Sequence, residues 1–212
     1  MQTSRNNANM HAIAQTEQVI DQIARDGYAV IEQFLPAGII TALAEEALAL
    51  KTSGTLRKAV TGKGPQSGSD TLRGDFIQWL EAPHSPARQY YLQAMDELRL
   101  ALNRSLYLGL FEFETHFAVY PAGTGYAKHL DQLANTQDRL VSTILYLNQN
   151  WQDVDGGKLR LYLGEDAYED IMPMGGKLVM FLSDRFWHEV LPANRERISL
   201  TGWFRKRSDA LP

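Results

Sequence analysis

Two residues near the middle of the chain, His129 and Asp131, could bind a metal ion. They lie in the segment YAKHLD, which reads as an extended strand, and residues two apart on a strand point to the same face. An imidazole and a carboxylate on one face are two of the three ligands of the 2-His-1-carboxylate site that binds non-haem Fe(II). A histidine on a strand is more often a structural residue than a ligand, so this pair alone does not define a metal site.

A third ligand could come from His188, in the segment FWHEV near the end of a strand-rich region. Strands that are distant in sequence stack in a jelly roll, which can bring this imidazole to the open side of His129 and Asp131. Three protein ligands on one face leave the opposite positions free for O2 and a chelating substrate. A structural zinc site would normally have a fourth protein ligand.

Arg197 follows the third histidine by nine residues and could anchor an anion. In RISLTGWF, alternation places Arg197, Ser199 and Thr201 on one face of a strand and the apolar residues between them on the other. An inward arginine needs an anionic partner because an unpaired buried charge is costly. Since the planar guanidinium group can bind a carboxylate through two parallel hydrogen bonds, we expect a small dicarboxylate as its partner.

The composition is that of an ordinary globular protein and excludes several functional classes. The 212 residues are 44% hydrophobic and 22% charged, with a net charge of −4, so no basic field favours nucleic acid or an anionic membrane. The absence of cysteine excludes disulfide frameworks, cysteine-based zinc sites, iron–sulfur clusters and a thiol nucleophile. No run approaches the ~18–20 apolar residues of a membrane span, and the N-terminal segment lacks the apolar core of a signal peptide. We therefore expect a cytoplasmic protein with neither nucleic-acid nor membrane partners.

The elements that must position these residues change character along the chain. Helical spacing dominates the first half, where cap residues mark the starts and ends of helices. We expect a helix over 16–26, a strand over 28–34, a helix opened by Pro36 and closed by Gly54, and a long helix capped by Ser85 and Pro86 that reaches about Leu108. Residues 53–75 are rich in Gly, Ser and Lys, and a loop of this length is usually functional or disordered. We interpret it as a substrate loop that could close as a lid.

Short strands follow, separated by breaks that contain Gly, Pro or Asn. Their spacing is typical of a sandwich or barrel rather than of a parallel α/β sheet. The strand segments are FEFETHFAVY, RLVSTILYLN, GKLRLYL, GKLVMFL, HEVLP and RISLTGWF. The predicted fold is α+β, with a jelly-roll core and supporting N-terminal helices. We predict a single domain over 1–212: a frayed end at 1–12, helical support and the substrate loop at 13–110, and the jelly-roll core at 111–205.

The order of H-x-D, a distal histidine and an arginine nine residues later resembles the 2-oxoglutarate- and Fe(II)-dependent oxygenases. Within them the similarity is to the prolyl hydroxylase group, which includes the hypoxia-inducible-factor prolyl hydroxylases and bacterial relatives. It extends from about Leu72 to Phe204 and is carried by LRGDFIQWLE, YPAGTGYAKHLD, RLVSTILYLNQNW, DGGKLRLY and FLSDRFWHEVLPANRERISLTGWF. The chain departs from the animal enzymes in YPAGTGY, which is one residue shorter, and in QLANTQD, so the rim of the pocket is expected to differ.

The resemblance implies a double-stranded β-helix and assigns a role to each candidate residue. His129, Asp131 and His188 would hold Fe(II), and Arg197 would bind the distal carboxylate of 2-oxoglutarate. The other implied positions are Tyr146, Tyr120 and Thr201 at 2-oxoglutarate, Tyr126, Leu159 and Trp203 in the pocket wall, and Arg73 and Asp75 at the protein substrate. For the aromatic residues, a place in the barrel core is the alternative. For Arg73 and Asp75, the alternative is a turn with a solvated ion pair.

The implied reaction is hydroxylation of an unactivated C–H bond by O2, with conversion of 2-oxoglutarate to succinate and CO2 and with ascorbate supporting activity. The expected substrate is a prolyl residue of a protein, for which a translation factor such as elongation factor Tu is a candidate by resemblance. Three alternatives stay open: the same chemistry on another residue or a small molecule, a zinc-dependent hydrolase, and a non-catalytic jelly-roll binding module. The identity of the substrate, oxygen sensing, the oligomeric state and the stereochemistry of hydroxylation are not encoded in these motifs.

Overall fold

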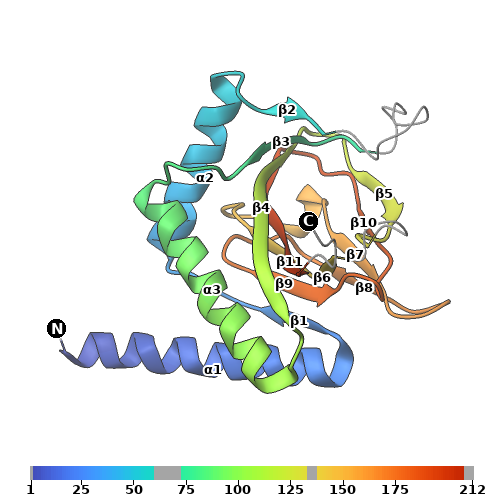
Figure 1. Ribbon diagram of the computed structural model, residues 1–212. Coiled ribbons are helices and arrows are strands. Elements are labelled where there is room, and N and C mark those ends of the chain that lie inside the picture. Colours follow the sequence, from blue (N-terminus) through green and yellow to red (C-terminus); the bar gives the residue numbers. More distant parts are fainter. Residues whose placement is uncertain (1, 60–72, 133–137, 208–212) are drawn as a thin grey trace, which may run out of the picture.

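The core of the protein consists of two antiparallel sheets that pack face to face (Figure 1). A computed structural model describes residues 2–59, 73–132 and 138–207, with side chains from Ile13 onward. The seven-stranded sheet has the order β1-β9-β6-β11-β4-β3-β2, and the four-stranded sheet has the order β5-β10-β7-β8. The large sheet consists of β1 (Tyr28–Ile31), β2 (Arg57–Lys58), β3 (Phe76–Trp79), β4 (Leu110–Tyr120), β6 (Arg139–Tyr146), β9 (Leu178–Leu182) and β11 (Arg197–Lys206). The small sheet consists of β5 (Tyr126–His129), β7 (Leu159–Tyr162), β8 (Tyr168–Ile171) and β10 (His188–Val190).

Three helices cover the outer face of the large sheet (Figure 1): α1 (Gln2–Asp26), α2 (Ala37–Thr52) and α3 (Pro86–Leu106). A short 3-10 helix, η1 (Asp153–Asp155), lies between β6 and β7. Apolar side chains on one face of α3, such as Met95 and Leu98, share a buried cluster with outward residues of β11, such as Ile198 and Leu200. The predicted alternation along β11 is therefore confirmed, since Arg197 and Thr201 face the cavity between the sheets. The predicted fold class, α+β with a jelly-roll core, is confirmed.

The helix ends follow local sequence signals closely. The hydroxyl of Ser85 accepts a hydrogen bond from the amide of Arg88 at 3.2 Å, with Pro86 in the first turn, as predicted for a capped start. The helix α3 ends two residues before the predicted Leu108 because Tyr107 adopts a left-handed backbone conformation (φ 54°). The structure places residues 2–12, for which we predicted a frayed end, in the first turns of α1. Neither Gly nor Pro interrupts this polar segment, so nothing in the backbone stops the helix.

Strands β2 and β3 lie in and next to the segment for which we predicted only a loop. The two strands pair with each other, and β3 also pairs with β4, so the large sheet extends further than the sequence indicated. The backbone amide of Ala59 donates to the carbonyl of Asp75 at 3.0 Å, which holds the two described ends of the loop together. Residues 60–72, the main part of the predicted lid, lie outside the described residues. Strand β8 was likewise not predicted, because YEDI is short and mostly polar.

Candidate active site

His129, Asp131 and His188 form a compact cluster with one ligand atom from each residue within 4.8 Å of the others. Strand β5 ends at His129, and its partner strand β10 begins at His188 directly opposite. The carboxylate of Asp131, two residues past the end of β5, lies 3.6 Å from Nε2 of each histidine. The three side chains are mostly buried, with exposed fractions of 19%, 10% and 5%. Pairing of two short strands thus brings together the three residues that the sequence singled out.

The hydrogen bonds around this cluster leave its metal-binding atoms free to face one another. Nδ1 of His129 bonds the carbonyl of Ala127 at 2.8 Å, and Nδ1 of His188 bonds the carbonyl of Phe186 at 3.1 Å. A carbonyl can only accept, so each Nδ1 carries the proton and each Nε2 has its lone pair available. A carboxylate and two imidazole lone pairs directed at one point repel each other unless a cation lies between them. The donor set therefore fits a divalent transition metal such as Fe(II).

The ionisation states of the cluster suit metal binding at neutral pH. Burial lowers the pKa of His188 to about 4, against an opposing effect of the Asp131 carboxylate. Burial alone would raise the pKa of Asp131, but His188, His129 and the hydroxyl of Ser142 lower it below its ordinary value. Ser142 on β6 donates to Oδ2 of Asp131 at 2.6 Å and so also fixes its orientation. A neutral imidazole at position 188 and an ionised carboxylate at position 131 are the forms that coordinate a metal.

Arg197 lies on the opposite, large sheet with its guanidinium group buried and incompletely paired. The residue is 1% exposed, and Nε donates to the carbonyl of Gly157 at 2.9 Å. Nη2 has no hydrogen-bond partner among the described residues. The guanidinium carbon lies 5.2 Å from the ring centre of Tyr120 and 4.9 Å from that of Tyr146. A buried cation with a free donor lacks an anion, which matches the expectation of a carboxylate partner.

Tyr146 is fully buried beside Arg197, and its hydroxyl also has no hydrogen-bond partner among the described residues. Burial raises the pKa of this phenol, while the nearby guanidinium charge of Arg197 acts in the opposite direction. Among the residues predicted for the site, Tyr146 is the one that is absent from the described lining of the cavity. Two unpaired polar groups at one position indicate a missing polar ligand.

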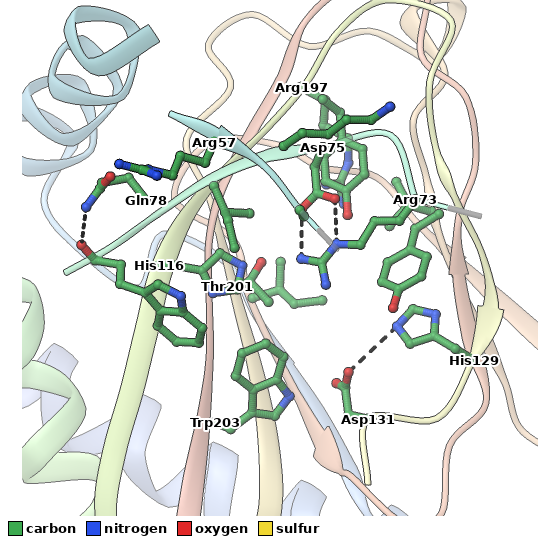
Figure 2. Close-up of a pocket in the computed structure, with 18 of the residues that line it drawn as sticks. Arg57, Arg73, Asp75, Gln78, His116, His129, Asp131, Arg197, Thr201 and Trp203 are labelled. Carbon is green, nitrogen blue, oxygen red and sulfur yellow. Dashed lines mark hydrogen bonds and ion pairs between the residues drawn. The ribbon is translucent and has the colours of Figure 1, made fainter. Parts of the chain in front are cut away.

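A cavity of about 1600 Å³ connects the cluster of His129, Asp131 and His188 to Arg197 (Figure 2). A cavity of this size exceeds the usual range for one small ligand, so it has room for a small dicarboxylate and part of a second molecule. The predicted pocket and co-substrate residues that line it are Tyr120, Tyr126, Leu159, Thr201 and Trp203. Arg73 and Asp75 also line it.

Arg73 and Asp75 are paired with each other rather than free. Nε and Nη2 of Arg73 donate to the two carboxylate oxygens of Asp75 at 2.6 and 2.9 Å (Figure 2), and Asp75 is 0% exposed. The guanidinium carbon of Arg73 lies 4.9 Å from the ring centre of Tyr126, which stacks on His129 at 3.7 Å. The expected alternative of a solvated ion pair is wrong for this pair, because its carboxylate is buried. The pair instead supports a ring that lies against the metal cluster.

Several residues of the cavity were not singled out from the sequence. Ser142 orients Asp131, and His116, Trp79 and Arg139 line the wall next to Trp203. The alternation of side chains along a strand could have indicated that Ser142 and His116 face the cavity. His116 is four residues before Tyr120 on β4, and Ser142 is four residues before Tyr146 on β6, so each shares an inward face with a predicted residue.

Comparisons with known protein families and sequences agree with this geometry. Residues 115–205 match the 2OG-Fe(II) oxygenase superfamily. The chain is 31% identical over 203 residues to prolyl hydroxylase EGLN3 of Homo sapiens, covering 89% of this chain and 82% of that protein. It is also 31% identical to Egl nine homolog 1 of Homo sapiens, again over 89% of this chain. The chain spans 46% to 58% of the length of this protein and its two rodent counterparts, so it corresponds to about half of them.

Solved structures show the same similarity. A prolyl-4-hydroxylase of Pseudomonas putida has 46% sequence identity and a TM-score of 0.84, covering 91% of this chain and all of that one. A prolyl hydroxylase in complex with a hypoxia-inducible-factor peptide fragment, from Trichoplax adhaerens, has 28% identity and a TM-score of 0.84. It covers 94% of this chain and 92% of that chain.

Proposed function

The chain belongs to the prolyl hydroxylase group of the 2-oxoglutarate- and Fe(II)-dependent oxygenases, and from this premise we propose that it hydroxylates a prolyl residue of a protein substrate. The reaction consumes O2 and 2-oxoglutarate and releases succinate and CO2. The observation that carries the proposal is the pairing of two features in one cavity: a three-ligand cluster at one wall and a buried, half-paired arginine at the other. A zinc hydrolase would leave Arg197 and Tyr146 without a role.

In this proposal His129, Asp131 and His188 hold Fe(II). The carbonyls of Ala127 and Phe186 keep the two Nε2 atoms directed at the metal. Fe(II) and 2-oxoglutarate, when bound, supply the activation of O2 and the oxidation of the C–H bond. The chain itself contributes a fixed ligand geometry and a cavity partly lined by apolar side chains, such as the fully buried Leu159.

Arg197 binds the distal carboxylate of 2-oxoglutarate through its free Nη2, with the hydroxyl of Tyr146 as a second donor. Support comes from the burial of both groups and from their lack of any other partner among the described residues. Nε of Arg197 is already committed to the carbonyl of Gly157, which fixes the plane of the guanidinium group. Tyr120 lies beside Arg197 at this end of the cavity, and Thr201, Tyr126 and Trp203 also line the cavity.

The substrate is a prolyl residue within a polypeptide; Arg73 helps to bind it, and the buried Asp75 acts through Arg73 by orienting its guanidinium group. The family of the chain and the volume left beside the co-substrate support this part of the proposal. The same chemistry on another residue or a small molecule is the alternative. A translation factor such as elongation factor Tu stays a candidate by resemblance, as do ascorbate support and a cytoplasmic location. Among the described residues, no helix is long and apolar enough to cross a membrane.

The proposal is tested by incubating the purified protein with Fe(II), O2, 2-oxoglutarate and ascorbate, and by measuring succinate. Candidate substrates are proline-containing peptides, including a hypoxia-inducible-factor fragment, and purified elongation factor Tu, each analysed by mass spectrometry for one added oxygen atom on proline. The variant His129→Ala should lose both succinate formation and iron binding, whereas His84→Ala, which lies outside the cavity lining, should retain them. If the His129→Ala variant binds iron as well as the parent, the metal assignment is wrong. If succinate forms but no proline gains oxygen, the prolyl part fails.

A further inference from the structure

His116 is a buried histidine that lines the active-site cavity. It lies on β4 opposite Thr201 of β11, is 1% exposed, and neither of its ring nitrogens has a hydrogen-bond partner among the described residues. Buried polar groups are normally paired, and an unpaired one calls for a ligand or ordered water. A histidine with two unpaired nitrogens is therefore a second place, besides Arg197, where the cavity lacks a polar partner.

The surroundings of His116 keep its imidazole neutral. Burial lowers its pKa to about 3, and the charges of Arg73 and Arg139 act in the same direction. A neutral imidazole has one N–H donor and one nitrogen acceptor. Both guanidinium groups are already paired with carboxylates, Arg73 with Asp75 at 2.6 Å and Arg139 with Glu114 at 2.8 Å. This wall therefore offers a neutral donor and acceptor rather than a free positive charge.

Two neighbouring tryptophan rings, whose centres lie 6.3 Å apart, pack against His116 and give the wall its shape. The ring centre of His116 lies 4.8 Å from that of Trp79 and 5.5 Å from that of Trp203. The guanidinium carbon of Arg139 stacks 3.5 Å from the ring centre of Trp203 and so fixes the indole. Nε1 of Trp203 is a further buried donor without a partner among the described residues. We call His116, Trp79 and Trp203 the aromatic wall.

The aromatic wall serves a different ligand from the one at Arg197. His116 is opposite Thr201, four residues along β11 from Arg197, which is about 13 Å at the usual rise of a strand. A five-carbon dicarboxylate that spans the metal and Arg197 does not also reach the wall. Figure 2 shows His116 and Trp203 on one side of the cavity and His129 and Asp131 on the other. A second molecule placed between them would face the metal from the aromatic wall.

We propose that His116 is a substrate-positioning residue whose imidazole hydrogen-bonds a backbone amide of the polypeptide next to the target proline. The neutral ring has one donor and one acceptor, so it can hydrogen-bond either a backbone carbonyl or a backbone N–H beside the proline. The apolar pyrrolidine ring fits against the flat faces of Trp79 and Trp203. A carboxylate fits less well because the two guanidinium groups that act on His116 are already paired. The inference rests on the proposed function and adds the group that recognises the peptide backbone.

The first experiment compares His116→Met, which removes both ring nitrogens at similar volume, with His116→Gln, which restores one donor and one acceptor. The probe is acetyl-Ala-Pro-Ala-amide, which has a peptide bond on each side of proline. We expect kcat/KM for hydroxylation of the probe to fall roughly tenfold or more in His116→Met, as for the loss of one hydrogen bond, and to recover in part in His116→Gln. The KM for 2-oxoglutarate and the succinate formed without the probe should be unchanged. The matched control is His84→Met, because His84 also has a buried unpaired nitrogen but does not line the cavity.

A second measurement gives a result even if the parent does not hydroxylate the probe. The parent is labelled with ¹⁵N-histidine, loaded with Zn(II) and an unreactive 2-oxoglutarate analogue, and titrated with the same probe. We expect the ring nitrogen signals of His116 to shift and saturate, and those of His84 to stay in place. Failure of turnover alone would count against the proposed prolyl hydroxylation. The role of His116 would be overturned by any of three results. These are unchanged His116 signals, a His116 shift caused by 2-oxoglutarate alone, and an unaltered kcat/KM in His116→Met.

Discussion

The hydroxyl of Tyr146 gives a sharp test of the co-substrate end, because Tyr146→Phe should change stability and binding in opposite directions. The hydroxyl is fully buried, has no hydrogen-bond partner among the described residues and lies beside the half-paired Arg197. In the protein without 2-oxoglutarate it is a desolvated group that makes no hydrogen bond within the described part of the chain. With 2-oxoglutarate bound, we expect it to donate to the same carboxylate as Arg197.

The expected changes in stability and in affinity follow from the environment of the Tyr146 hydroxyl without and with bound 2-oxoglutarate. A buried polar group without a partner costs about 1–3 kcal/mol, so the phenylalanine variant should be more stable than the parent by about 1 kcal/mol or more when no ligand is present. For a domain of this size, each kcal/mol raises Tm by about 2–4 °C. A hydrogen bond to a charged group contributes about 1.5–3 kcal/mol. The Kd for 2-oxoglutarate should therefore rise roughly 10- to 150-fold.

The assay is thermal unfolding with and without 2-oxoglutarate, together with calorimetric titration of the metal-loaded protein. Tyr91→Phe is the matched control, since Tyr91 is equally buried but its hydroxyl is paired with Oγ1 of Thr115 at 3.1 Å. That variant should lose about 1 kcal/mol of stability and keep its affinity for 2-oxoglutarate. The reasoning is refuted if Tyr146→Phe loses stability as Tyr91→Phe does and binds 2-oxoglutarate like the parent.

Three further predictions address the metal, the aromatic wall and the backbone. Ser142→Ala removes the 2.6 Å hydrogen bond to Asp131, and calorimetry should show metal affinity lower by roughly 10- to 100-fold; unchanged affinity would show that the serine does not orient the ligand. The pKa of His116 is about 3 in the folded protein and has its ordinary value of 6.5 in the unfolded chain. With respect to this group, the folded protein therefore keeps its full stability above pH 6.5 and loses up to about 1.4 kcal/mol per pH unit as the pH falls below that value. Urea unfolding of His116→Gln should show a smaller loss of stability in acid than the parent, and equal losses would contradict the burial argument. Gly125→Ala places a Cβ against the carbonyl oxygen of Val190, so the paired ends of β5 and β10 should separate and metal affinity should fall. The control is Gly164→Ala, whose Cβ meets nothing within 4 Å and which should leave both metal affinity and Tm unchanged.

The sequence was sufficient to predict the strands whose patterns are local and the three residues that form the His-Asp-His cluster. Alternation along RISLTGWF placed Arg197 inward and Leu200 against the helices, and the structure agrees. Pairing of β5 with β10 brings His188 opposite His129, which the sequence could only anticipate from the fold class. These predictions succeeded because burial on two faces imposes a period of two on a strand.

The features that the sequence did not reveal depend on partners far away in the chain. FIQW is too short to be recognised as a strand, and it becomes β3 only because β4 offers it an unpaired edge. For Arg73 and Asp75, predicted at the protein substrate, a solvated turn stayed open as the alternative, because nothing local indicates that Asp75 is fully buried. His116 belongs to no motif, and its importance arises from what surrounds it rather than from its spacing.

The division of the site between two sheets has a consequence for motion. The three metal-cluster residues lie on or just after strands of the small sheet, whereas Arg197 and Tyr146 belong to the large sheet with its helical backing. The strands that carry the cluster are three and four residues long, while β4 and β11 have eleven and ten. Amide hydrogen exchange should therefore be fastest in β5 and β10 and should slow there when metal binds, while β4 and β11 stay protected throughout. A ligand that contacts both the metal and Arg197 would link the two sheets to each other. Binding of that ligand would therefore also rigidify the small sheet, on which none of the α-helices in the described part of the chain packs.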